Sequence, residues 1–305
     1  MSLLVERFAA AKEGEGPRSP QDEIVQCVKA LRRRLGLRAV APVRLESFLV
    51  ARNIQDVTTD DTLQADGALA PLGADFGAGF RMILRRDLPE GRINFTVAHE
   101  ICHTFFYERV PEIKFAAHPA DPEEERLCNS GAEELLMPGL DVKRRAKEKS
   151  VSLAALQALA ADYRVSAPAM LIRLRNLGLW KAELVLWHGM TNGTFAVKRQ
   201  WGGRMADWRW LEDAIPRAAL SASPGKILSG QTFWVVDTPR GQRFKPVVYH
   251  VARHRGDLLA LVLKGQKKKP PQASCSGQSE FFPRALKHEK TQGIRSRPRS
   301  DGRER

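Results

Sequence analysis

Cysteine pairs, a signal peptide and long apolar runs are all missing from this 305-residue sequence. The four cysteines, Cys27, Cys102, Cys128 and Cys275, are widely spaced and form no CxxC pair, which argues against a disulfide framework and against a cysteine-based zinc site. No window approaches the roughly 18 consecutive apolar residues of a membrane span, and the start, MSLLVERFAAAKEGEG, carries acidic residues where a signal peptide would be apolar. We therefore expect reduced thiols, no membrane partner and a cytoplasmic location.

The net charge of +14 is unevenly distributed along the chain. Residues 266–305 contain 11 Lys and Arg against 4 Asp and Glu, so this segment carries half of the net charge. It is rich in Pro, Ser, Gly and Arg and has few apolar residues, so it cannot bury enough surface to fold. We expect a disordered basic tail, which either contacts DNA nonspecifically or is a solvated terminus without a partner.

Histidine is scarce, with seven in the chain, yet two of them stand four residues apart in FTVAHEICHTFF, residues 95–106. On a helix His99 and His103 share one face, close enough to bind one metal ion, and Glu100 lies between them. In such an HExxH motif two imidazoles and a third ligand hold zinc, the fourth position takes a water whose pKa falls to about 7, and the glutamate removes its proton. The alternative is a helix whose histidines hydrogen-bond locally, but the apolar flanks bury this helix, and buried histidines need partners.

A third ligand is available in the acidic helix that begins at Asp121 and stops at Pro138. Helical spacing places Glu125 beside the buried side of this helix, so its carboxylate is the best candidate. Asn129, four residues later, is a partner that could orient the ligands. We interpret the neighbouring carboxylates as a solvated helix start; they are Glu123 and Glu124.

The rest of the chain predicts an α+β fold. Helical spacing of apolar residues predicts helices over 22–35 and 42–52, and FRMILRRD (80–87) predicts a strand. Residues 150–180 predict two short helices joined by a tight turn, with Ser152 and Ser166 as N-caps. Beyond residue 181 five compact apolar runs predict a small sheet domain with one helical insert near 205–220: ELVLW, TFAVK, TFWVV, PVVYHVA and LLALVL.

Three motifs, in this order, resemble the ImmA/IrrE family of metallo-endopeptidases: INFTVAHEICHTFF, EERLCNSGAEELLMP and LAALQALAADYRVSAPAMLIRLRNLGLW. The family's pattern is close to RFTLAHELGHLLL, ExxANxFAAELLMP and LAxxFxVSxxAxxxRLxxLGL, and the resemblance covers about residues 40–180. It implies zinc bound by His99, His103 and Glu125, with Glu100 as the catalytic base. Manganese and iron are alternative metals in the cell, and a 2-His-1-carboxylate set also suits iron.

Two residues depart from the family pattern. Cys102 replaces the glycine of HELGH, and Gly131 replaces the phenylalanine of NxFAAE, so the resemblance implies looser packing beneath the zinc helix. We interpret Cys102 as a small buried filler rather than a redox switch. The group that stabilises the oxyanion is left open between three candidates, Tyr107, His118 and Tyr163.

The layout is most similar to the IrrE subgroup, which implies a zincin-like HExxH peptidase domain, a helix-turn-helix-like segment and a C-terminal GAF-like sheet domain. The predicted divisions are a flexible N-terminus (1–20), the zinc metallopeptidase domain (21–148), the helix-turn-helix-like segment (149–181), the GAF-like α/β sensor domain (182–265) and the disordered basic tail (266–305).

Similar proteins act as regulatory proteases that cut helix-turn-helix repressors and so switch on stress-response genes, of the radiation or DNA-damage type, or mobile-element genes. We therefore expect a site-specific zinc endopeptidase whose partner is a helix-turn-helix repressor. The alternative is a DNA-binding transcriptional regulator with a structural or vestigial metal site, which would bind DNA with residues 150–180 and the basic tail. Arg164, Arg173 and Arg175 lie in or near the second helix. The second helix has few polar side chains to read base edges, and a structural zinc needs no base such as Glu100.

Overall fold

The computed structural model describes residues 2–10, 18–114, 121–189, 195–202, 209–210, 215, 219–220, 226–238, 241–254 and 257–264. Several predicted features lie outside these residues: the basic tail, Cys275, His118 and most of the helical insert near 205–220. Among the described residues, no helix is both long enough and apolar enough to cross a membrane.

The N-terminus forms a helix, α1 (Leu3–Ala10), so the prediction of a flexible segment over 1–20 was wrong for these residues. One face of α1 is apolar and is buried in the core, where the Phe8 ring stacks on Phe106 with 4.1 Å between ring centroids. The predicted helices that follow are confirmed as α2 (Pro20–Arg34) and α3 (Glu46–Ala51).

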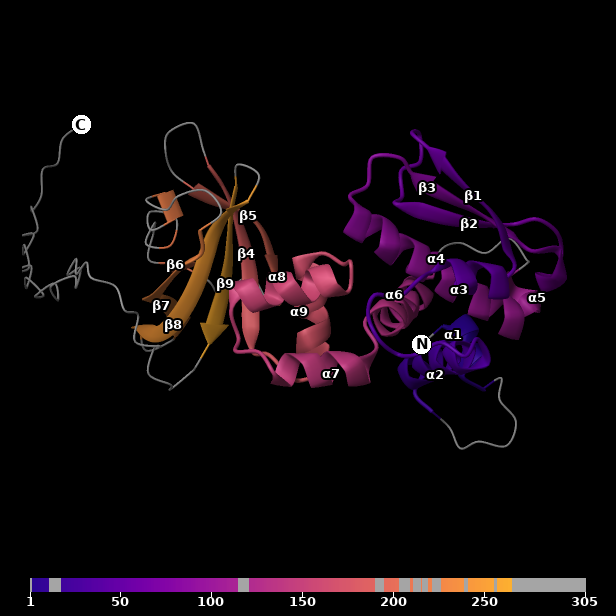
Figure 1. Ribbon diagram of the computed structural model, residues 1–305, viewed down its shortest axis with the longest axis horizontal. Coiled ribbons are helices and arrows are strands. Elements are labelled where there is room, and N and C mark those ends of the chain that lie inside the picture. The colour runs from indigo at the N-terminus through magenta and orange to yellow at the C-terminus, as the bar shows by residue number, and fades with distance from the viewer. Residues whose placement is uncertain are drawn as a thin grey trace, which may run out of the picture. The chain divides into compact units, whose positions relative to one another are not determined.

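A three-stranded sheet comes next, in the order β1-β3-β2. Its strands are β1 (Ile54–Asp60), β2 (Gly67–Pro71) and β3 (Phe80–Arg85), and β3 confirms the strand predicted over 80–87. The central strand β3 pairs in parallel with β1 and in antiparallel with β2. As a result β2 is an edge strand, and Figure 1 shows it lying over α4.

Two long helices form the centre of this part, α4 (Glu90–Arg109) and α6 (Pro122–Leu136), joined through the short α5 (Pro111–Lys114). The Asp121 side chain caps α6 by accepting from the backbone N–H of Glu123 at 2.8 Å. Helices α4 and α6 pack against each other, and α2 packs against α6. The predicted helix stop at Pro138 is confirmed.

Three further helices follow, α7 (Gly139–Lys147), α8 (Leu153–Asp162) and α9 (Ala167–Asn176). The two predicted N-caps are confirmed, because the side chains of Ser152 and Ser166 accept from backbone N–H groups in the first turns of α8 and α9. The helix pair predicted over 150–180 is therefore present.

The apolar runs beyond residue 181 form a six-stranded antiparallel sheet in the order β5-β4-β9-β8-β7-β6. The central strands bury both faces: Leu184 and Leu261 join the same apolar cluster as α9, while Val185 and Val262 join a second cluster. Its strands are β4 (Ala182–Gly189), β5 (Phe195–Trp201), β6 (Arg209–Trp210), β7 (Leu228–Thr238), β8 (Gly241–His254) and β9 (Asp257–Lys264).

Candidate metal centre

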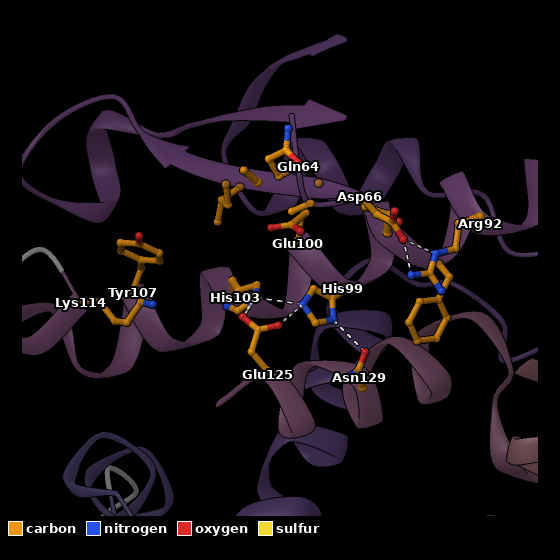
Figure 2. A pocket seen from close by; sticks show the side chains of 16 residues that line it. Gln64, Asp66, Arg92, His99, Glu100, His103, Tyr107, Lys114, Glu125 and Asn129 are labelled. Atoms are coloured by element: carbon orange, nitrogen blue, oxygen red, sulfur yellow. Dashed lines mark hydrogen bonds and ion pairs between the residues drawn. The ribbon is translucent and has the colours of Figure 1, made fainter. Parts of the chain in front are cut away.

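Helix α4 presents His99 and His103 on one face, as their spacing predicts. The two Nε2 atoms lie 3.0 Å apart, and both rings are mostly buried. From α6, the Glu125 carboxylate lies 3.1 Å from His99 Nε2 and 3.4 Å from His103 Nε2. Figure 2 shows the three side chains pointing toward one another.

These separations fit one tetrahedral ion. Ligand atoms about 2.0–2.1 Å from a zinc ion lie about 3.3 Å apart along the edges of a tetrahedron. The two Nε2 atoms lie 3.0 Å apart, and the two oxygens of the Glu125 carboxylate lie 3.1 Å from His99 Nε2 (Oε2) and 3.4 Å from His103 Nε2 (Oε1), which is close to that spacing. His99, His103 and Glu125 therefore form a donor set of the type that catalytic zinc sites use, two imidazoles and one carboxylate.

The other ring nitrogens are held by acceptors. His99 Nδ1 lies 3.1 Å from Asn129 Oδ1, and His103 Nδ1 lies 2.7 Å from Glu124 Oε1. An amide oxygen and a carboxylate can only accept, so each Nδ1–H donates. Each Nε2 then offers its lone pair to a metal once the proton that it shares with Glu125 is released. Asn129 thus lies where it can orient the His99 ring, as the sequence suggested.

Glu124 contradicts its interpretation as part of a solvated helix start. Its side chain is 4% exposed, and it accepts from both His103 and the Lys114 ammonium. The α6 turn that directs Glu125 to the two Nε2 atoms directs Glu124 inward, beneath His103. Glu123 is only half-buried.

The charges around the site favour a cation at its centre. Hydrogen bonds from His103 and His99 hold the pKa of Glu125 far below its usual range. Burial opposes a positive charge on His103, but the surrounding Cys128, Glu124 and Glu125 outweigh burial and raise the pKa of His103 well above its usual value. The residues present therefore fit a divalent metal in donor type, spacing, tautomer and charge.

Glu100 lies on the side of the donor set that faces β2. Its side chain is 5% exposed, and burial raises the pKa of this carboxyl despite the nearby imidazoles of His103 and His99. Strand β2 approaches it closely at Gly67: a Cβ there would overlap the Thr96 methyl and would stand 3.0 Å from Glu100 Oε1. Glycine is thus required where the edge strand passes the carboxylate.

A cavity of about 690 Å³ opens above these groups. It is lined by β2, by α4 and by the donor residues of α6, and Arg92 and Asp66, which form an ion pair, lie at one end of it. Lys114 and Tyr107 lie together beyond His103, as Figure 2 shows. The cavity gives the donor set access to solvent and to a substrate.

Among the residues that the structure describes, no strand pairs with the edge of β2 opposite β3, and Gly67, Ala68 and Leu69 of β2 line this cavity. Arg85 N–H donates to Asp66 C=O, and Leu72 N–H donates to Gly79 C=O, so the even-numbered residues of β2 pair with β3. The backbone groups of Gly67 and Leu69 consequently point toward the free edge. An extended peptide could add to this edge and pass alongside Glu100. Residue spacing did not predict this feature, because the free edge of a strand depends on which strands pair.

Of the two candidate oxyanion stabilisers that the structure describes, one lies at the site. Tyr107 follows His103 by one helical turn and lines the cavity. Tyr163 is buried elsewhere, where its hydroxyl donates to Asp141 at 2.7 Å, so it cannot take that role. His118 lies outside the described residues.

Comparison with known protein families identifies the segment that holds this centre. Residues 62–175, from just before β2 to the last turn of α9, match the family model described as Peptidase_M78, IrrE N-terminal-like domain. The chain carries an IrrE N-terminal-like domain of the ImmA/IrrE family. This domain match supports a metallopeptidase-type role and suggests a metal ion.

Two other comparisons add little to the IrrE-like assignment. No curated protein matches the chain. A solved structure described as a Mycobacterium tuberculosis transcriptional regulator matches with 14% sequence identity over 86% of this chain and 80% of that chain, at a TM-score of 0.47. At this TM-score the likeness carries no argument about fold or function.

Proposed function

We propose that this protein is a zinc-dependent endopeptidase that cuts a protein substrate at one defined bond. The observation that carries the proposal is the convergence of His99 Nε2, His103 Nε2 and Glu125 within 3.0–3.4 Å of one another, beside the buried carboxylate of Glu100. Manganese or iron could occupy the same donors, and metal analysis of the purified protein decides between them.

The chain's own groups fit the steps of peptide hydrolysis. When bound, zinc supplies Lewis acidity, which polarises the scissile carbonyl and makes a water molecule acidic near pH 7. Glu100 accepts the proton from that water and delivers it to the leaving amine. Burial, which raises its carboxyl pKa, suits a group that must both accept and release a proton near neutral pH.

The substrate is held as an extended strand. Its backbone pairs with the N–H and C=O groups of Gly67 and Leu69 that point away from β3 on the edge of β2. Pairing at Gly67, where a Cβ would stand 3.0 Å from Glu100 Oε1, would bring the substrate backbone beside Glu100 in the cavity that the metal donors line. Tyr107, from its position in the same cavity, is the candidate that stabilises the oxyanion.

The substrate we propose is a helix-turn-helix transcriptional repressor whose cleavage switches on stress-response genes, of the radiation or DNA-damage type, or mobile-element genes. Support comes from the IrrE N-terminal-like domain and from the resemblance of the three motifs to regulatory proteases. The α8–α9 pair, proposed as helix-turn-helix-like, and the six-stranded sheet, proposed as GAF-like, would contribute substrate recognition and signal sensing.

The test is incubation of the zinc-loaded protein with a candidate repressor, followed by intact-mass measurement. We expect one cut with the wild type and a rate at least about 100-fold lower with Glu100→Gln, at unchanged metal content. Glu90→Gln makes the same chemical change at an exposed position of the same helix and should cut normally. Equal cutting by Glu100→Gln would refute the proposed role of Glu100.

The alternative, a DNA-binding regulator with a structural metal site, has less support. Arg173 donates to the Met137 carbonyl at 3.0 Å and forms a buried ion pair with Glu134, and Arg175 donates to the Ala182 carbonyl at 2.7 Å. Two of the three arginines considered for DNA contact therefore hold the protein together. Absence of any cut, together with tight, salt-sensitive DNA binding, would favour the regulator.

A further inference from the structure

His103 lies between two sets of metal-ligating groups. Its Nε2 faces His99 and Glu125, the outer set described above, while its Nδ1 lies 2.7 Å from Glu124 Oε1, and His103, Glu124 and Cys128 form a second, inner set. In each set the ligand atoms lie within 4.8 Å of one another. The imidazole can serve either set, so something must decide which nitrogen a metal receives.

Lys114 forms an ion pair with Glu124, the carboxylate of the inner set. Its ammonium donates to both oxygens of Glu124, at 2.9 and 3.1 Å, and the two side chains are 14% and 4% exposed. Lys114 also lies over the Tyr107 ring, with Nζ 4.8 Å from the centroid, so it is held from a second side. The buried carboxylate thus has two fixed partners, an ammonium and an imidazole N–H.

We propose that Glu124 and Lys114 form a positioning pair that assigns Nε2 of His103 to the metal. This inference rests on the proposed metallopeptidase function. Glu124 fixes the tautomer and ring orientation of His103, and its negative charge strengthens Nε2 as a donor. Lys114 balances that charge and keeps Glu124 from becoming a ligand itself.

The two imidazoles of the site therefore have different hydrogen-bond acceptors at Nδ1. His99 donates to the neutral amide of Asn129, whereas His103 donates to a carboxylate that belongs to an ion pair. Removing the charge of Glu124 would leave the Lys114 ammonium unbalanced close to a divalent cation, and the two positive charges would repel each other. This repulsion predicts weaker metal binding when Glu124 alone loses its charge, and partial recovery when Lys114 loses its charge as well.

Zinc affinity is measured by competition with a chelator for the wild type, Glu124→Gln, Lys114→Met and the double variant. These substitutions keep side-chain size and remove charge. We expect Glu124→Gln to bind zinc at least about tenfold more weakly than the wild type. The double variant should bind more tightly than Glu124→Gln, because its surplus positive charge is gone. Glu123→Gln, one residue earlier on α6, should bind like the wild type.

Two outcomes would overturn the inference: zinc affinity of Glu124→Gln within about twofold of the wild type, or a double variant that binds no more tightly than Glu124→Gln. A wild type that binds no metal would overturn the proposed function and this inference together. Thermal unfolding of each metal-free variant checks that it is folded, so a loss of affinity is not a loss of structure.

Cobalt substitution tests the assignment of the nitrogen directly. With Co²⁺ at Nε2, no sulfur ligand is present, so the wild type should lack thiolate-to-cobalt charge-transfer absorption in the near ultraviolet and should have the same spectrum as Cys128→Ser. A charge-transfer band that Cys128→Ser abolishes would place the metal on the inner set and overturn the proposal.

Discussion

Gly131 on α6 has no side chain, and Cys102 on α4 packs into the space beside it. A Cβ at Gly131 would stand 2.6 Å from Cys102 Sγ and 3.0 Å from Ile24 Cγ1, so α6 can lie this close to α4 only with glycine here. Cys102 and Cys128 are fully buried. The looser packing implied by the family comparison was therefore wrong: the thiol on α4 fills the volume that the missing side chain on α6 leaves.

We predict that Gly131→Ala destabilises the protein by about 1–3 kcal/mol, because overpacking outweighs the usual gain of about 1 kcal/mol for Gly→Ala within a helix. Urea unfolding of the metal-free protein measures the free energy of unfolding. Adding Cys102→Ala removes the Sγ and should recover most of the loss. A Gly131→Ala variant as stable as the wild type would contradict the close packing.

At the scale of elements, the edge position of β2 gives its odd and even residues different roles. The N–H of Ala68 belongs to the ladder with β3, whereas the N–H of Leu69 points to the free edge beside the cavity. Proline is tolerated in strands where its missing N–H would have faced away from the ladder. The two positions therefore separate substrate binding from sheet stability.

We predict that Leu69→Pro lowers kcat/KM by about tenfold relative to Leu69→Ala, because one hydrogen bond to the substrate strand is lost. Both variants lose the leucine side chain, so their difference reports the N–H alone. Ala68→Pro, in contrast, should destabilise the sheet measurably in thermal unfolding. Equal kcat/KM for Leu69→Pro and Leu69→Ala would rule out pairing of the substrate at this N–H.

At the scale of the whole molecule, Asp141 joins segments that are far apart in sequence. Its buried carboxylate accepts from the Tyr163 hydroxyl at 2.7 Å, from Ala41 N–H at 3.2 Å, and from Arg144 and Arg145 at 2.6 and 3.1 Å. Burial alone would raise the pKa of Asp141, but these donors outweigh burial and lower it. The carboxylate thus stabilises the packing of α7 and α8 in its ionised form.

We predict that Asp141→Asn costs about 2–3 kcal/mol at pH 7, since hydrogen bonds to a charged group are lost. The folded-state pKa is lowered, so this contribution is fully present above the unfolded value of about 3.9 and disappears as pH falls through the folded value. Urea unfolding at pH 7 and below pH 4 should show the difference shrinking. Asp162→Asn, a half-exposed partner of Arg145, should cost less than about 1 kcal/mol.

Much of the structure follows from local patterns that the sequence displays directly. Helical spacing alone is enough to place His99 and His103 on one face, with Glu100 between them, and the two serine N-caps were predicted for the same reason. These features depend on residues within one or two helical turns of each other, so the local sequence is enough to predict them. Glu125 was also predicted, and it lies at the donor set.

The burial of Glu124, by contrast, was decided only by the tertiary structure. Consecutive glutamates at a helix start look solvated in sequence, and no local pattern shows that Lys114 and His103 enclose one of them. The exclusion of Tyr163 from the site has the same origin, because its partner Asp141 lies on another helix. Contacts between segments distant in sequence leave no periodic signal. The metal-donor residues could therefore be predicted from the sequence, whereas the residues that hold those donors in place could not.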